Sequence, residues 1–429
     1  MPAFFKRFFR HSALLAGSVF LAIVPAWARQ AEAAQPHLRN LVVIGDSLSA
    51  GFQNFSLYDS DSIVPAAPPG GQSHGFANLI AEQANVSLAL PLIQYPGIPP
   101  VLTFEGGVIS RASGIGTREP QTLTVQTHNL SVPGFELLDV LVHKVNLPNL
   151  QSNPQAASFA DALAVEILGY PSLLTNPPFG CGVIPRANGD VLLSEALCAI
   201  ELKPTTILIS AGNEDALQAL TVGAQPTDLK LFAAYYQLLL EGLSRYTKAK
   251  IVVSNIPNVT DIPFLVSYLG FEARCGMPPA GAGPTDYLVP NITDPNVTTF
   301  NICTNYSVRS ASLIAQAQTA VHDYNLIIAA AASKFGAVVV DVNKLFAGIA
   351  ANGYDVAGHH LTNLYLGGIF SLDAVHPTNT GYALLANAFI DKMNCELHTN
   401  IPPVNIEQVA ATDPLICLPG SLDPTCPVP

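Results

Sequence analysis

Charge is scarce in this 429-residue chain, and basic charge is the scarcer kind. Only 12% of the residues are charged, with 19 Lys and Arg against 31 Asp and Glu, for a net charge of −12. Nucleic-acid binding depends on clustered basic side chains that displace counterions, so we expect no nucleic-acid partner. Anionic lipid surfaces are disfavoured as electrostatic targets for the same reason. The composition favours neutral or apolar ligands.

Long uninterrupted helices are expected to be few. The 35 prolines and 31 glycines imply many turns and loops and exclude a coiled coil. Hydrophobic residues make up 49% of the sequence, enough apolar surface to offset the entropy lost on folding, which excludes general disorder. The length fits one large domain or two ordinary ones.

After the first 28 residues, no segment is apolar enough to span a membrane. The start combines basic residues (Lys6, Arg7 and Arg10), an apolar run over 13–24 and a small-x-small site at 26–28. This pattern is typical of a cleaved secretory signal peptide, and an uncleaved membrane anchor is the alternative. We therefore predict a signal peptide over 1–28 and a secreted or periplasmic protein.

The seven cysteines show no CxxC spacing and no Cys/His cluster, so the sequence indicates no zinc site and no metal or other cofactor. In an oxidising compartment, cysteines that flank Pro- or Gly-rich excursions are candidates for disulfides. Other pairings remain open, and the odd count leaves one thiol unpaired, for which Cys395 is the candidate. The pairs that we predict are Cys181–Cys198, Cys275–Cys303 and Cys417–Cys426.

Short β-branched runs alternate with helical patterns along the chain, which predicts an α/β fold with a mostly parallel sheet flanked by helices in three layers. The predicted strands are Leu41–Ile44, Thr206–Ser210, Ile251–Ser254 and Val338–Asp341. Two helical faces lie between the later strands: Phe232, Tyr236, Leu239, Leu243 and Tyr246 on one, and Ile314, Ala317, Val321, Tyr324 and Ile328 on the other.

Two Pro- and Gly-rich stretches, at about 55–126 and 261–310, do not follow this alternation. We interpret them as insertions over one end of the sheet within a single domain spanning 29–399. Their apolar runs at 91–96 and 263–266 either form an acyl pocket or pack on the core. The Pro-rich segment 400–429 is predicted to be a surface tail.

The first chemical feature follows the first predicted strand. Gly45, Asp46 and Ser47 place a permissive backbone and a serine hydroxyl at the carboxyl end of a buried strand. Ligands bind at this edge of open α/β sheets. A serine after a strand is also a common turn former or helix cap, so this motif indicates a catalytic serine only in combination with other motifs.

The second feature is the run Asp373-Ala374-Val375-His376-Pro377, which precedes a helical face made by Tyr382, Leu385 and Phe389. An aspartate three residues before a histidine can reach its Nδ1 when both share a loop, which fixes the tautomer and supports the imidazolium. The alternative is a surface histidine beside an aspartate that caps the helix.

Together, Gly45-Asp46-Ser47-Leu48 and the late Asp-x-x-His-Pro resemble the GDSL family of esterases and lipases, also called SGNH hydrolases. Two further blocks match that family in order, Asn129–Gly134 and Ser210–Asp215. The resemblance implies a flavodoxin-like fold and a serine esterase in which Ser47 is the nucleophile. It also implies that His376 is the general base and that Asp373 orients it.

For the oxyanion hole, the resemblance implies the backbone N–H groups of Ser47 and Gly134 and a side-chain amide. The family usually has Gly-x-Asn-Asp in its third block, whereas this chain has Gly212-Asn213-Glu214-Asp215. A carboxylate in place of the amide would repel the developing oxyanion, so we assign this role to Asn213 rather than Glu214.

The implied function is a secreted esterase or lipase that acts on a small-molecule or lipid ester, neutral or lipid-like, with transient contact with lipid aggregates. An acyltransferase or a carbohydrate acetylesterase on the same fold remains an alternative, as does a non-catalytic binding protein.

A competing serine motif, Gly71-Gln72-Ser73-His74-Gly75, matches the GxSxG elbow. Adjacent prolines at 68 and 69 exclude the central strand that an elbow needs, so we predict a loop there.

Overall fold

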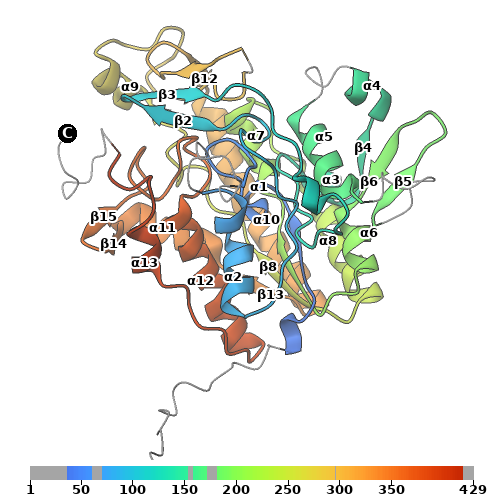
Figure 1. Cartoon of the computed structure of the whole chain (residues 1–429). Helices are drawn as coiled ribbons and strands as arrows, with labels where there is room; N and C mark the ends of the chain where they lie inside the picture. Colours follow the sequence, from blue (N-terminus) through green and yellow to red (C-terminus); the bar gives the residue numbers. More distant parts are fainter. Residues whose placement is uncertain (1–35, 60–69, 153–157, 172–180, 295, 419–429) are drawn as a thin grey trace, which may run out of the picture. The chain divides into compact units, whose positions relative to one another are not determined.

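A computed structural model of the protein describes residues 36–59, 70–152, 158–171, 181–294 and 296–418 (Figure 1). The predicted signal peptide and Cys426 lie outside these residues. In the described part of the chain, no helix is both long and apolar enough to cross a bilayer.

The central sheet consists of four parallel strands in the order β1-β7-β8-β13. These are β1 (Leu41–Gly45), β7 (Thr206–Ser210), β8 (Lys250–Ser254) and β13 (Val338–Val340). Every residue of β1 and β7 is buried, as expected for strands covered on both faces. The predicted parallel sheet is confirmed, with strand limits that differ by at most one residue at either end.

A further segment runs beside the outer edge of β1. Val43 forms a parallel bridge with Asn129, in which Val43 N–H donates to His128 O and Leu130 N–H donates to Val43 O. This segment occupies the place of a fifth strand next to β1. The chain that leads to Gly134 therefore leaves the sheet at the same edge as the chain that leads to Ser47.

Helices cover both faces of the sheet (Figure 1). On one side α2 (Phe76–Gln83) packs on α12 (Asn379–Glu396), and on the other α8 (Leu229–Tyr246) packs on α10 (Ala311–Phe335). Both α10 and α12 contact β13, which confirms the predicted three layers.

The predicted helical faces are buried in α8, α10 and α12, with one exception. Tyr246 is 65% exposed, so its assignment to the buried face of α8 was wrong. It is the last residue of α8, one turn beyond Leu243, the last buried residue of that helix. The 3.6-residue sequence pattern continues to the end of the helix, whereas the burial of this face ends at Leu243.

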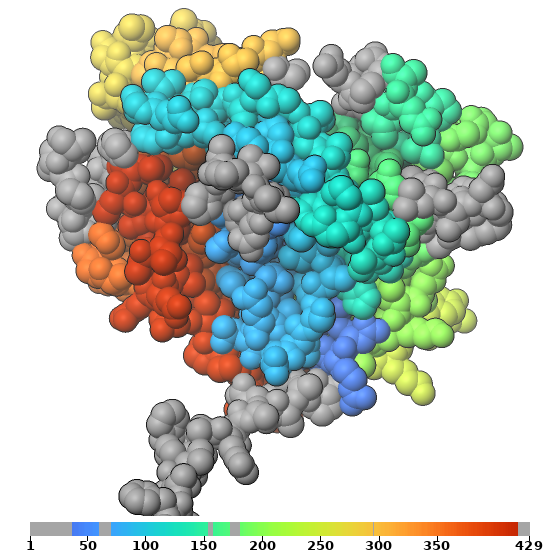
Figure 2. Space-filling model, in the orientation of Figure 1, coloured from blue at the N-terminus to red at the C-terminus, as the bar shows by residue number. Residues whose placement is uncertain are grey.

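The two predicted insertions contain small antiparallel sheets of their own. β11 in the second insertion pairs with β3 in the first, so the two segments are hydrogen-bonded to each other. In Figure 2 the cyan surface of the first insertion adjoins the yellow and orange surface of the second. The sheets comprise β2 (Leu102–Glu105), β3 (Val108–Arg111) and β11 (Thr299–Phe300), and β9 (Val266–Ser267), β10 (Tyr287–Pro290) and β12 (Tyr306–Arg309).

Several shorter elements complete the described part of the fold. The strands are β4 (His143–Val145), β5 (Val183–Pro185), β6 (Val191–Leu193), β14 (Tyr354–Val356) and β15 (His359–Leu361). The helices are α1 (Ser47–Ala50), α3 (Leu137–Leu141), α4 (Leu147–Ser152), α5 (Phe159–Ala164), α6 (Glu195–Glu201), α7 (Glu214–Thr221), α9 (Tyr268–Cys275), α11 (Val342–Asn352) and α13 (Ile406–Ala410).

Two of the predicted disulfides are present, Cys181–Cys198 and Cys275–Cys303. Cys395 is a free, exposed thiol, as predicted. The third predicted pair includes Cys426, which falls outside the described residues.

Candidate active site

Ser47 is the first residue of the short helix α1, directly after strand β1. The turn between them requires Gly45, whose φ is +141° and where an added Cβ would lie 1.9 Å from the backbone oxygen of Ser210 in β7. Asp46 caps α1 by accepting a hydrogen bond from Leu48 N–H at 3.2 Å. This tight strand-to-helix turn places the Ser47 side chain at the carboxyl end of the sheet.

The structure brings His376 and Asp373 to Ser47, although more than 300 residues separate them in sequence. His376 Nε2 lies 2.8 Å from Ser47 Oγ, and His376 Nδ1 lies 3.0 Å from Asp373 Oδ2. Since Nδ1 faces a carboxylate, it carries the proton, and Nε2 accepts a hydrogen bond from the serine hydroxyl. The alternative of a surface histidine beside a capping aspartate does not fit, because both side chains are buried.

The Asp373 carboxylate is fully buried and accepts four hydrogen bonds. Oδ1 accepts from Val375 N–H and His376 N–H at 2.8 Å each, and Oδ2 accepts from Phe55 N–H at 2.6 Å as well as from the imidazole. Burial raises the pKa of Asp373, but the His376 charge and these hydrogen bonds outweigh it, so the net shift is downward. Asp373 therefore remains ionised beside the histidine.

Aromatic rings enclose the other side of the imidazole. The Phe52 ring lies 4.8 Å from the His376 ring, and Phe52 contacts both Phe55 and Phe159. Phe159 belongs to α5 and lies against Gly134, where an added Cβ would meet its ring at 3.2 Å. The histidine is thus shielded from water on this side.

Gly134 has a φ of +86°, a conformation that favours glycine. It follows Val132, whose N–H donates to Gly45 O at 3.1 Å, so the loop is joined to the end of the nucleophile strand. The structure thus places Gly134 beside the turn that carries Ser47, although Gly134 does not line the pocket at the serine.

Asn213 lines the same pocket as Ser47 and His376. Its side-chain Nδ2 donates to both carboxylate oxygens of Asp46, at 2.9 and 3.1 Å, and its backbone N–H donates to the same carboxylate at 3.0 Å. The contact between Asp46 and the amide is a feature that the sequence analysis missed. Glu214 does not line this pocket.

A group of acids with raised pKa values lies behind the pocket. Burial, reinforced by neighbouring acids, raises the pKa of Glu214 to about 8 and that of Asp215 to about 7. Burial also raises the pKa of Asp46 to about 6, against the effect of its bonds to Asn213 and Leu48. Glu214 is therefore largely neutral at pH 7, and it presents no full negative charge near the serine.

We expect Glu214→Gln to flatten the pH dependence of stability. Because the folded-state pKa of Glu214 lies above its ordinary value of 4.5, the folded protein holds a proton that the unfolded chain has lost. The stabilisation is complete below about pH 4.5 and is lost as the pH rises through about 8. Urea unfolding at pH 5, 7 and 9 measures the free energy of unfolding. Between pH 5 and pH 9 this free energy should fall by roughly 2–3 kcal/mol more in the parent than in the variant.

The matched control is Glu272→Gln, which removes an exposed carboxylate from α9. It should keep the pH dependence of the parent. Parallel stability curves for the parent and Glu214→Gln would show that Glu214 does not titrate in this range.

Ser73, the serine of the competing motif, lies in a 3-10 turn. Its hydroxyl group donates a hydrogen bond to Asp59 Oδ1 at 2.7 Å. The prolines before it fall outside the described residues. His360 pairs with Asp355 at 2.7 Å, away from the serine–histidine pair. Within the described ranges, no group of three or more His, Cys, Asp or Glu side chains is arranged to hold a metal ion.

The pocket at Ser47 is lined mainly by aliphatic and aromatic side chains. Of the two alternatives left open for the runs at 91–96 and 263–266, an acyl pocket or packing on the core, Ile93 follows the second because it is fully buried in the core. Pro263 and Val266 line a separate groove instead of the pocket at Ser47. The loop after β8 supplies much of the wall instead, and Ile262 lines both the pocket and the groove. The apolar lining comprises Leu48, Leu217, Ile256, Pro257, Val259, Ile262, Phe346, Phe370, Val375 and Pro377.

Residues 41–389 match the model of a family described as GDSL-like Lipase/Acylhydrolase. No curated protein matches the chain. Among solved structures, similarity is found to LAE5, an α/β hydrolase from the metagenome of Lake Arreo in Spain, with a TM-score of 0.36, 11% identity and coverage of 83% of this chain and 94% of that one. Axe2, an acetylxylan esterase from Geobacillus stearothermophilus, has a TM-score of 0.35, 13% identity and coverage of 82% and 93%.

Proposed function

Because the chain belongs to the GDSL-like lipase/acylhydrolase family, we propose that it hydrolyses carboxylic esters with neutral, lipid-like acyl groups and uses Ser47 as the nucleophile. The observation that carries this proposal is the hydrogen-bonded series Ser47–His376–Asp373, whose first two members line an apolar pocket. Hydroxyl, imidazole and buried carboxylate in this order are the arrangement that acyl transfer by serine requires.

In the proposed reaction, Ser47 Oγ attacks the ester carbonyl carbon while its proton moves to His376 Nε2. Asp373 holds the ring through Nδ1 and stabilises the imidazolium that forms. When the tetrahedral intermediate collapses, Nε2 returns the proton to the leaving alcohol, and an acyl-enzyme remains. Water then attacks the acyl group with His376 as base, which releases the acid and restores the serine.

The developing oxyanion needs donors that are already in place. The proposed donors are the backbone N–H groups of Ser47 and Gly134 and the side-chain amide of Asn213. The Asn213 amide has two hydrogens, and its contact with the Asp46 carboxylate uses one and fixes the orientation of the group. Nδ2 also lies 3.4 Å from Ser210 Oγ, and in the proposed reaction the substrate oxygen replaces this weaker acceptor of the second hydrogen.

The substrate class follows from the pocket lining. Among the residues that the structure describes, no Lys, Arg, Asp or Glu lines the pocket at Ser47, so a charged acyl group would be desolvated there without a partner. An aliphatic acyl chain would bury apolar surface there, and the adjoining groove offers space for a larger alcohol or for contact with lipid aggregates. Two disulfides and the predicted signal peptide support the further proposal that the protein works outside the cytoplasm.

We expect the parent protein to hydrolyse p-nitrophenyl esters and to prefer medium acyl chains over acetate. Leu217 on α7 lines the pocket, and Leu217→Trp should shorten it. Each excluded methylene forfeits up to about 0.8 kcal/mol of transfer free energy, so kcat/KM for octanoate should fall roughly 10–50-fold while that for acetate changes little. A kcat/KM profile over acyl lengths from two to sixteen carbons measures both results.

Leu238→Trp is the matched control, since Leu238 is 58% exposed on α8 and does not line the pocket. Its acyl-length profile should equal that of the parent. A parent that hydrolyses none of these esters would contradict the proposed function. An unchanged profile in Leu217→Trp would instead show that the acyl chain binds elsewhere, for example in the groove.

A further inference from the structure

A buried glutamate joins the two chain segments that lead to the proposed backbone donors. Glu195 is the first residue of α6, and its side chain is 0% exposed. Its Oε2 accepts the Gly45 N–H at 2.7 Å, and its Oε1 accepts the Val132 N–H at 3.1 Å. One carboxyl group thus bridges the end of β1 and the loop beside it.

This carboxyl replaces a backbone acceptor. Val43 N–H donates to His128 O, and in a regular parallel ladder the next donor on the same side, Gly45 N–H, would meet Leu130 O. Gly45 N–H donates to Glu195 instead, at the point where the two chains leave the sheet. The glutamate therefore acts at the last rung of the ladder, where Val132 N–H also donates to Gly45 O at 3.1 Å, and it takes the place of the missing acceptor for Gly45 N–H.

The two contacts occupy equivalent positions relative to the proposed donors. Gly45 is two residues before Ser47, and Val132 is two residues before Gly134. A shift of the carboxyl would therefore move both backbone N–H groups that we assign to the oxyanion. A misplacement of about 1 Å in such a site can lower the rate by roughly 100-fold.

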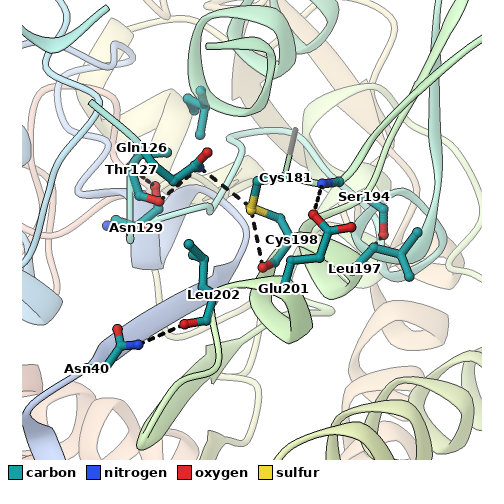
Figure 3. Close-up of a disulfide and its surroundings, with 12 residues drawn as sticks. Asn40, Gln126, Thr127, Asn129, Cys181, Ser194, Leu197, Cys198, Glu201 and Leu202 are labelled. Carbon is teal, nitrogen blue, oxygen red and sulfur yellow. Dashed lines mark hydrogen bonds between the residues drawn. A yellow bond between two sulfur atoms is a disulfide. The ribbon is translucent and has the colours of Figure 1, made fainter. Parts of the chain in front are cut away.

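The helix that carries Glu195 is itself held in place. Ser194 caps α6 by accepting the Leu197 N–H at 3.1 Å, and Cys198, one turn after Glu195, forms the disulfide with Cys181. Figure 3 shows this disulfide close to the segment before Asn129, where Gln126 Nε2 donates to Cys198 Sγ at 3.7 Å. α6 also contacts β1 and α3.

We propose that Glu195 is a positioning residue, which fixes the distance between the Ser47 and Gly134 N–H groups and so shapes the oxyanion hole. This inference rests on the proposed function. A buried carboxyl group costs stability unless hydrogen bonds compensate it, and here both oxygens are used on the two segments that must be aligned. The group makes no contact with the pocket, so it acts through the backbone alone.

Glu195→Gln tests the inference. The amide keeps the shape of the side chain, but it has only one acceptor and turns an NH₂ group towards the second N–H donor. We expect kcat for p-nitrophenyl butyrate to fall about 10–100-fold, with KM within about twofold of the parent value. Inhibition by a trifluoromethyl ketone, which forms an oxyanion on the serine, should weaken by a similar factor. A merely structural role would lower the melting temperature and leave both readouts unchanged.

The matched control is Glu201→Gln on the same helix. Glu201 also accepts a backbone N–H, that of Gly182 at 3.1 Å, but this contact lies beside the disulfide rather than the oxyanion loop (Figure 3). Its kcat and inhibitor affinity should equal those of the parent. Hydrogen exchange of the peptide covering 128–135 should be faster in Glu195→Gln and unchanged in Glu201→Gln, a readout that needs no hydrolysis.

The outcomes separate this inference from the proposed function. If the parent hydrolyses no ester, the proposed function fails and the exchange rates alone decide whether Glu195 positions the loop. If the parent is active, a Glu195→Gln variant with kcat and exchange rates within twofold of the parent overturns the inference. Should Glu195→Gln fail to fold, Glu195→Asp decides by the same readouts, because its carboxylate is one methylene too short to reach both N–H groups.

Discussion

Ser47→Ala is expected to lower ester hydrolysis by on the order of 10⁴–10⁶-fold, which would leave activity near the background of the assay. The substitution removes the oxygen that lies 2.8 Å from His376 Nε2, and without it the base has no nucleophile to activate. The backbone of α1 and its Asp46 cap do not depend on the hydroxyl, so the variant should fold. Initial rates with p-nitrophenyl butyrate and a thermal unfolding curve measure both expectations.

Ser73→Ala is the control for Ser47→Ala. It removes the serine of the GxSxG motif, whose hydroxyl donates a hydrogen bond to Asp59. The variant should keep the activity of the parent. The opposite pattern, activity lost in Ser73→Ala and kept in Ser47→Ala, would move the nucleophile to Ser73. A fluorophosphonate that labels the Ser47 peptide in the parent would locate the nucleophile directly.

Asp373→Asn is expected to lower kcat about 10³–10⁴-fold. An asparagine at this buried position has one acceptor oxygen, whereas the Asp373 carboxylate accepts from three backbone N–H groups and from His376 Nδ1. If its NH₂ group faces the ring, Nδ1 must become the acceptor and Nε2 the donor, so the histidine can no longer take the serine proton. Single-turnover rates with p-nitrophenyl acetate report this step.

Asp228→Asn serves as the matched control because Asp228 also accepts two backbone N–H groups, at the start of α8, but lies outside the pocket. Asparagine caps helices about as well as aspartate, so this variant should keep both stability and activity. A folded Asp373→Asn variant with kcat within tenfold of the parent would remove Asp373 from the proposed mechanism.

The parallel sheet could be predicted because its strands leave a local signal. Residues 41–44 and 207–209 are unbroken apolar runs, as burial on both faces demands, and the helices between the later strands keep a clear 3.6-residue period. The segment beside β1 carried no such signal. It makes one bridge at Asn129 and then turns away, so its place in the sheet depends on a partner distant in sequence.

The serine and histidine were predictable because each sits in a short motif whose local geometry is nearly self-contained. Glu195 was not, since nothing around it differs from an ordinary first turn of a helix, where acidic residues are common. Its partners Gly45 and Val132 lie at least 63 residues away in the sequence, so no local pattern indicates these contacts. The pocket wall could not be assigned for a similar reason: apolar runs indicate burial but not which cavity they face.

The pairing of β11 with β3 has a consequence for attempts to change specificity by loop exchange. If only one of the two inserted segments were replaced by that of a relative, the other would lose its hydrogen-bonding neighbour. Its exposed strand edge could then pair with another molecule and cause aggregation. Chimeras should therefore carry both segments from a single donor, and a natural family member that lacks one of them is expected to lack the other.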